Sequence, residues 1–139
     1  MNARRLVRGR PVVAAGAVLA LVACALPWGR TAAARGNLPP ISYGFDGPAI
    51  LVFIAAALTL ALLALPFATA DRPPLLDRPV VLAAVLALGA VGLVIRAVQL
   101  LDLGVLGLPD RSPGFWLAAL GLVLMLWGAS PLLTGRRRD

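Results

Sequence analysis

The chain contains no histidine, glutamate or lysine, because its thirteen basic residues are all arginine and its six acidic residues are all aspartate. Histidine and glutamate are among the commonest metal ligands and general bases, so their absence removes most familiar metal centres and acid–base sites. A single cysteine excludes an intrachain disulfide and a Cys-x-x-Cys redox centre. We therefore expect a protein that is not an enzyme, with no catalytic residue, no metal and no cofactor.

Charge of either sign is also scarce. Charged residues make up 14% of the chain and hydrophobic residues 60%, with a mean hydropathy of +0.92. A soluble domain has roughly 45–50% apolar and about 25% charged residues, and a soluble fold of 139 residues could not cover so much apolar surface. The composition therefore predicts an integral membrane protein. The arginines flank apolar runs, so we expect them to contact anionic lipid head groups of the bilayer and not nucleic acid.

Four apolar runs are each long enough to cross about 30 Å of hydrocarbon, which takes roughly 20 residues of α-helix. They cover residues 11–28, 47–69, 79–101 and 114–133. None alternates with a period of two, which favours helices over barrel strands. We predict an all-α membrane protein, with four transmembrane helices in an antiparallel bundle. Residues 1–139 would form this single domain, with no soluble domain.

Helix-start residues support these boundaries. Asp46 and Asp77 each stand two residues before a proline, and Ser112 stands directly before one, at the start of an apolar run. A polar cap followed by proline in the first turn is typical of a helix N-terminus. Thr59, in the middle of the second run, is expected to bond to the backbone of its own helix.

The arginines predict the orientation of the bundle, because cytoplasmic loops of membrane proteins are enriched in basic residues. Nine arginines fall on one side of the four runs and three on the other. The first group is Arg4, Arg5, Arg8, Arg10, Arg72, Arg78, Arg136, Arg137 and Arg138; the second is Arg30, Arg35 and Arg111. Both termini are thus predicted to be cytoplasmic. The residue usage is typical of a GC-rich bacterial genome, which places the protein in the bacterial cell (inner) membrane.

Two further features are expected on the opposite side of the membrane, aromatic anchors and an ordered connection. Trp28 and Trp116, with Tyr43 and Phe45 nearby, are predicted to anchor the outer interface, where aromatic side chains gather. The connection of residues 29–46 is the longest and is rich in proline and glycine. It is the best candidate for an ordered feature outside the membrane.

Arg96 is the most informative residue in the chain, because it lies inside the third run, about 7–8 Å from its outer end. Gly89, Gly92, Arg96 and Gln99 are spaced three, four and three apart and share one helix face. Small residues mark helix contacts in membranes, so we predict that this face packs against the bundle. An ion pair of Arg96 with Asp46 is the preferred interpretation.

Two alternatives to this pair remain open. The partner of Arg96 could be Asp102 or Asp110, which lie on the same side. The arginine could also extend its long side chain to the head groups without a protein partner.

Cys24 ends the segment Leu-Val-Ala-Cys, which resembles a bacterial lipoprotein signal preceded by arginines and an apolar stretch. Cleavage and lipidation at this cysteine would remove the first run. The apolar segment Ala-Leu-Pro-Trp and three more runs follow, where a lipoprotein continues into a polar region. We therefore expect Cys24 to be unmodified and the N-terminus to be retained, with lipidation as the alternative.

The arrangement of Pro27, Trp28, Gly44, Asp46 and Gly47 is similar to one found in small uncharacterised four-helix membrane proteins of GC-rich bacteria, especially actinobacteria. In those proteins the first helix ends in Pro-Trp and a Gly-x-Asp-Gly segment opens the second. The likeness covers the first half of the chain and implies an architecture without an activity.

These patterns favour a non-enzymatic accessory or scaffold subunit, held in a complex with other membrane subunits or as a homo-oligomer. A small transporter or channel subunit working as a dimer is the alternative, in which the Arg96 face would attract anions. A lipid-processing enzyme is a third hypothesis, for which aspartate and arginine alone would have to supply the chemistry.

Overall fold

The computed structural model describes residues 3–30, 41–68, 79–102, 104 and 112–134. Within these ranges, four α-helices account for most of the chain. They are α1 (Ala3–Cys24), α2 (Ile50–Ala68), α3 (Pro79–Asp102) and α4 (Pro113–Thr134). Two short strands, β1 (Pro27–Arg30) and β2 (Ile41–Tyr43), and the 3₁₀ turn η1 (Gly47–Ala49) lie between α1 and α2.

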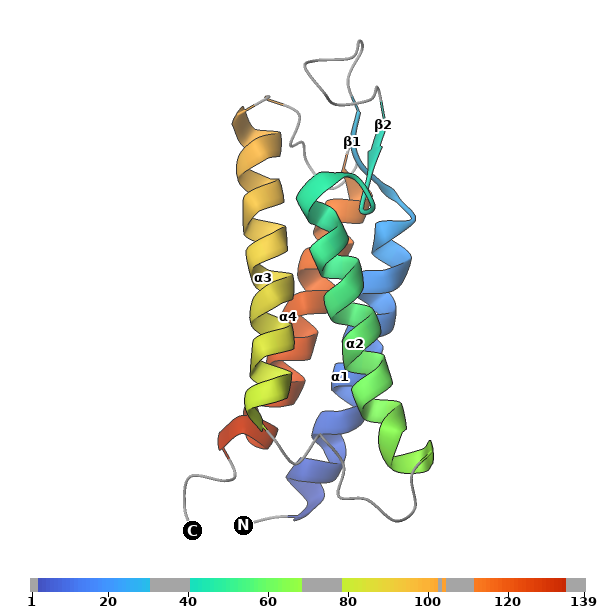
Figure 1. The fold of residues 1–139 in the computed structure, drawn as a ribbon, viewed down its shortest axis with the longest axis vertical. Helices are drawn as coiled ribbons and strands as arrows, with labels where there is room; N and C mark the ends of the chain where they lie inside the picture. The colour runs from blue at the N-terminus through green and yellow to red at the C-terminus, as the bar shows by residue number, and fades with distance from the viewer. Residues whose placement is uncertain (1–2, 31–40, 69–78, 103, 105–111, 135–139) are drawn as a thin grey trace.

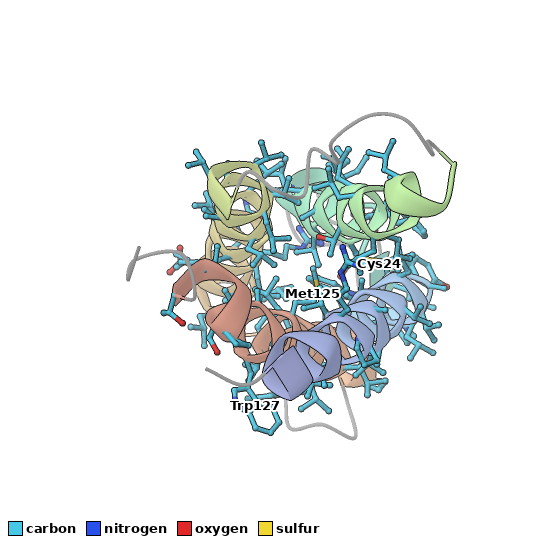
Figure 2. All side chains as sticks on the ribbon, turned by 90° about the horizontal axis from the view of Figure 1, so that it is seen from below. Cys24, Met125 and Trp127 are labelled. Carbon is cyan, nitrogen blue, oxygen red and sulfur yellow. The ribbon has the colours of Figure 1, made fainter. Side chains whose placement is uncertain are left out.

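The four helices run alternately up and down side by side, so that both chain ends lie at the same end of the molecule (Figure 1). Each helix packs on its neighbours in the chain, and α1 also packs on α4, which closes the ring. Figure 2, seen from the end that holds the termini, shows this ring of four. We call that end the terminal end, and the opposite end, with β1 and β2, the hairpin end. The described residues are mostly helical, with four helices as predicted, and the pair β1–β2 departs from the all-α prediction.

Three of the helices are long and apolar enough to cross a membrane. The candidate spans are Gly47–Leu65, Val80–Asp102 and Pro113–Pro131, with hydropathies of 2.6, 2.5 and 1.5. The part of α1 in which a span was sought, Gly9–Cys24, is apolar but shorter than these spans. A fourth span remains a prediction.

The first helix ends at Cys24, and the predicted end at Trp28 was wrong. The N–H groups of Ala25 and Leu26 donate to the carbonyl oxygens of Val22 and Ala23, both at 3.1 Å, which tightens the last turn. Pro27, which has no N–H to continue the helix, instead opens β1. The long connection of residues 29–46 is ordered at both ends, where β1 pairs antiparallel with β2.

The contact between α1 and α4 is a seam of small residues with heptad-like spacing. In each helix the buried positions recur after four and three residues, which is the spacing of a helix-pair seam. The α1–α4 seam consists of Gly9, Val13, Gly16, Ala20 and Ala23 on α1, and Gly114, Ala118, Gly121, Met125 and Gly128 on α4, all buried.

The backbones touch across this seam. A Cβ atom placed on Gly16 would lie 2.6 Å from the Gly121 carbonyl oxygen, and one placed on Gly121 would lie 2.7 Å from the Gly16 carbonyl oxygen. Gly9 and Gly128 face each other in the same way, with 2.6 Å and 3.0 Å to the opposite carbonyl oxygens. Helices can approach this closely only where side chains are missing.

The inside and outside of the bundle are both apolar. Figure 2 shows Cys24 and Met125 pointing inward, whereas Trp127 points away from the bundle. Leu86, Leu122 and Met125 are among the residues that fill the interior. The outer surface carries many exposed large hydrophobic side chains, with Trp127 70% exposed. A surface of this kind suits lipid or another apolar helix.

Candidate functional site

Arg96 lies inside the protein, close to the hairpin end of α3. Its side chain is 2% exposed and is one of the largest fully buried side chains among the described residues. It stands six positions before Asp102, the last residue of α3. A buried guanidinium is costly unless other groups bond to it, so its surroundings decide what it can do.

The two glycines on the same face bring α3 onto α2. A Cβ atom on Gly89 would lie 2.9 Å from the Ala55 Cβ atom, and one on Gly92 would lie 2.6 Å from the Leu51 Cβ atom and 3.0 Å from the Pro48 carbonyl oxygen. The stripe predicted from the sequence thus faces the bundle, and it places Arg96 beside η1.

The guanidinium of Arg96 has one protein hydrogen bond. Nη1 donates to Oε1 of Gln99 at 3.3 Å, so the last member of the stripe holds one end of the group. Nη1 also lies beside Gly47, where an added Cβ atom would be 3.7 Å away. Nε and Nη2 are both buried and have no hydrogen-bond partner. Two nitrogen donors of a buried cation, which together carry three N–H groups, are therefore left unused.

Asp46 lies near this arginine but does not bond to it. The residue occupies the N-cap position of η1, yet its side chain makes no capping hydrogen bond. Its Oδ2 atom instead accepts a hydrogen bond from the backbone N–H of Tyr43 at 2.6 Å. The charge of Asp46 still acts on Arg96 through space. The predicted ion pair of Arg96 with Asp46 is thus not bonded in the structure, where the carboxylate is held by the N–H of Tyr43.

Asp102, one alternative partner of Arg96, is exposed at the end of α3, and Asp110 lies outside the described residues. The side chain of Arg96 is 2% exposed, so in the structure it does not extend to the surface as snorkelling would require.

Trp28 is not an interface anchor, which corrects the prediction from the sequence. Its side chain is fully buried, its Nε1 atom donates to the Ala23 carbonyl oxygen at 2.9 Å, and its ring meets Phe115 edge-on at 5.8 Å. The β1–β2 register shifts between Pro27 and Gly29, so Trp28 sits at a bulge, which can redirect a side chain. Trp116 is 43% exposed, which suits the predicted anchor.

Cys24 is a free, buried thiol at the C-terminus of α1. The carbonyl oxygen of Cys24 accepts the N–H of Gly44 at 3.0 Å. A Cβ atom added to Gly44 would lie 2.8 Å from the Cβ atom of Cys24. The hairpin thus packs directly on this residue. Retention of the N-terminus and the absence of a lipid remain predictions.

Thr59 donates its hydroxyl hydrogen bond to the Ala55 carbonyl oxygen of its own helix at 2.8 Å, as predicted.

Sequence reasoning missed the α1–α4 seam. Its signal was present, because Gly9 and Gly16 are seven residues apart and Gly114, Gly121 and Gly128 repeat the same interval. Among the described residues, no group of three or more cysteines or aspartates is placed to hold a metal ion.

The chain matches no protein-family model, no curated protein and no solved structure. The candidate site therefore rests on the geometry around Arg96, and the architecture on the packing of the four helices.

Proposed function

We propose that this protein is a non-enzymatic structural subunit of the cell membrane, which acts in a larger membrane complex or as a homo-oligomer. The α1–α4 seam supports this role. Backbone contact at two levels, between Gly9 and Gly128 and between Gly16 and Gly121, leaves the first and last helices no freedom to slide without steric conflict. A rigid helix pair of this kind suits a scaffold.

The outward surface is where a partner would bind, since every helix exposes large hydrophobic side chains there. We choose one such residue from each helix for the experiment: Val22, Leu58, Val91 and Trp127, which are 53%, 44%, 52% and 70% exposed. Neighbouring helices in membranes associate by close packing of surfaces like these. The identity of the contacting helix can therefore be read by crosslinking.

Photo-crosslinking in intact membranes tests the structural role. A photoreactive phenylalanine analogue replaces Val22, Leu58, Val91 or Trp127 in turn, and the buried Met125 serves as the matched control. We expect one or two of the outward positions to give a discrete protein adduct, either with a second copy or with another membrane subunit, and Met125 to give none between chains. If all four outward positions yield only lipid adducts of the monomer, the proposed scaffold role is wrong.

The proposed topology has four spans with both termini in the cytoplasm. The nine-to-three distribution of arginines supports it, although many of these arginines lie outside the described residues. In the structure, Tyr43 lies at the hairpin end and Thr134 at the terminal end, and both are exposed.

Single cysteines at these two positions, in a Cys24→Ala background, test the topology. We expect a membrane-impermeant thiol reagent added to intact cells or spheroplasts to label Tyr43→Cys and to miss Thr134→Cys until the membrane is opened. The reverse pattern would place the termini outside, and labelling of both would mean an even number of spans between the two positions, against the three predicted.

A small transporter or channel subunit working as a dimer is the second candidate, and the buried cation at Arg96 is the observation that favours it. Uptake of a labelled anion by liposomes distinguishes the two functions. Purified protein in liposomes should show no uptake of labelled phosphate or acetate above protein-free vesicles if it is a scaffold, and saturable uptake if it is a transporter.

A further inference from the structure

The two unused donors of Arg96 lie on the same edge of its guanidinium. Nε and Nη2 are adjacent along that edge, and their N–H bonds run nearly parallel, which is the fork that carboxylates and phosphates accept with two oxygens. Nη1, on the remaining corner, is taken by Gln99. The hydrogen bond to Gln99 therefore orients the guanidinium and leaves its bidentate edge unbonded.

The surroundings of the guanidinium favour negative charge. Nη1 of Arg96 lies beside Gly47, the first residue of the continuous helical segment Gly47–Leu65. The N-terminus of a helix carries a partial positive charge of about half an elementary charge, so the cation and the helix end repel each other. Asp46 offsets this only through space, because its carboxylate is bonded to Tyr43.

We propose that the hairpin end of the bundle binds an oxyanion, a carboxylate or a phosphate, on the Nε–Nη2 edge of Arg96. The anion would accept two parallel hydrogen bonds from that edge. A buried guanidinium with two unpartnered donors is a costly feature, and an oxyanion removes the cost at both donors. Such binding requires neither catalysis nor transport, and it goes beyond the structural role proposed above.

Two sources could supply this chemistry, an anionic lipid head group or a free oxyanion. The experiment therefore uses the full-length protein in nanodiscs of two compositions. In the first arm, phosphatidylcholine nanodiscs are titrated with inorganic phosphate or acetate at constant ionic strength. In the second arm, increasing amounts of phosphatidylglycerol replace the phosphatidylcholine. The midpoint of thermal unfolding is measured in both arms.

We expect the midpoint to rise in at least one arm and to saturate, with a total shift of at least about 5 °C. A response in the first arm alone identifies a free oxyanion, and one in the second alone identifies a lipid head group. Arg96→Met, which keeps the length of the side chain and removes the charge, should abolish the response. Arg10→Met, at an exposed arginine near the terminal end of α1, is the matched control and should keep it.

Gln99→Glu provides a variant that retains the arginine. The new carboxylate would take the place of the amide oxygen that already contacts Nη1, and it would supply a permanent internal anion. We expect this variant to unfold at a higher temperature than the wild type without added anion, and to respond several-fold less to phosphate or phosphatidylglycerol.

The proposal is overturned if the wild type responds in neither arm. It is also overturned if Arg96→Met shifts as much as the wild type, since the anions would then act elsewhere. Should Arg96→Met fail to fold, a response of Gln99→Glu as large as that of the wild type decides against the site. If the photo-crosslinking experiment yields a partner adduct but neither anion changes the unfolding midpoint, the structural role stands and only the anion site is refuted.

Discussion

Gly16→Leu should prevent α1 from packing on α4, and we expect the variant to lose its cooperative thermal unfolding in mild detergent. A Cβ atom at this position would lie 2.6 Å from the Gly121 carbonyl oxygen and 2.8 Å from the Met125 backbone nitrogen. Both are backbone atoms of a helix, and neither can rotate out of the way as a side chain would. The two helices must therefore separate along the α1–α4 seam, which removes the close packing that membrane helices depend on.

A single added methyl group gives a graded version of the same test. Gly16→Ala gains about 1 kcal/mol of helix propensity, whereas overpacking a close contact costs typically about 1–3 kcal/mol. The cost of the clash should exceed the gain in helix propensity, because the clash involves the backbone of α4. We expect Gly16→Ala to be less stable than the wild type by up to about 2 kcal/mol, the difference between the two effects.

The neighbouring residue supplies the control. Ala15 is exposed on the outward side of α1, so Ala15→Leu adds the same bulk to the same turn and should leave the unfolding midpoint nearly unchanged. Gly16→Ala combined with Gly121→Ala should cost less than the two single effects added together, because the first methyl group already separates the helices. A Gly16→Ala variant as stable as the wild type would show that the backbones do not touch.

The positions of three helices could be predicted from the sequence, because length and hydropathy determine them. α2, α3 and α4 begin and end within three residues of the predicted runs of 47–69, 79–101 and 114–133. Proline at the first position of α3 and α4 marks both starts. The end of α1 was missed, because an apolar Pro-Trp pair is equally compatible with a helix end and with a strand that turns back over the bundle.

The candidate site could be predicted only in part, because helical spacing identifies a face but not the contacts it makes. The stripe that contains Gly92 and Arg96 was recognisable, since spacings of three and four place residues on one side. That Asp46 bonds to Tyr43 depends on a turn that no spacing reveals. The seam was missed for a related reason, since glycines seven residues apart become informative only when the first and last helices are known to be neighbours.

Trp28→Ala should be the most damaging truncation outside the seam, with a loss of about 3–5 kcal/mol, as is typical when a buried aromatic side chain is removed. The indole is fully buried and packs edge-on against Phe115 of α4. Gly114 makes room for it, since a Cβ atom there would lie 2.6 Å from the Trp28 Cδ1 atom. The residue therefore joins the hairpin to α4, and its removal leaves a cavity where both meet α1.

The indole N–H contributes separately, because it is a second donor to a carbonyl group at the end of α1. Nε1 donates to the Ala23 oxygen at 2.9 Å, which also accepts the N–H of Leu26 at 3.1 Å. Trp28→Phe keeps most of the ring and removes this donor. We expect it to cost about 0.5–1.5 kcal/mol, the usual net contribution of one hydrogen bond, and less than Trp28→Ala, because the Ala23 oxygen keeps the N–H of Leu26.

The other two tryptophans are the matched controls, and thermal unfolding in detergent is the measurement. Trp116 and Trp127 are 43% and 70% exposed, so Trp116→Ala and Trp127→Ala should change the stability by no more than about 0.5 kcal/mol.

Quenching of tryptophan fluorescence by brominated lipids is a second measurement. We expect quenching of Trp116 and Trp127, and no quenching in a variant whose sole tryptophan is Trp28. An interface anchor would behave in the opposite way: Trp28→Ala would be as mild as the other two, and bromine would quench its fluorescence. Burial of the ring between the hairpin and α4 predicts a severe loss of stability and no quenching.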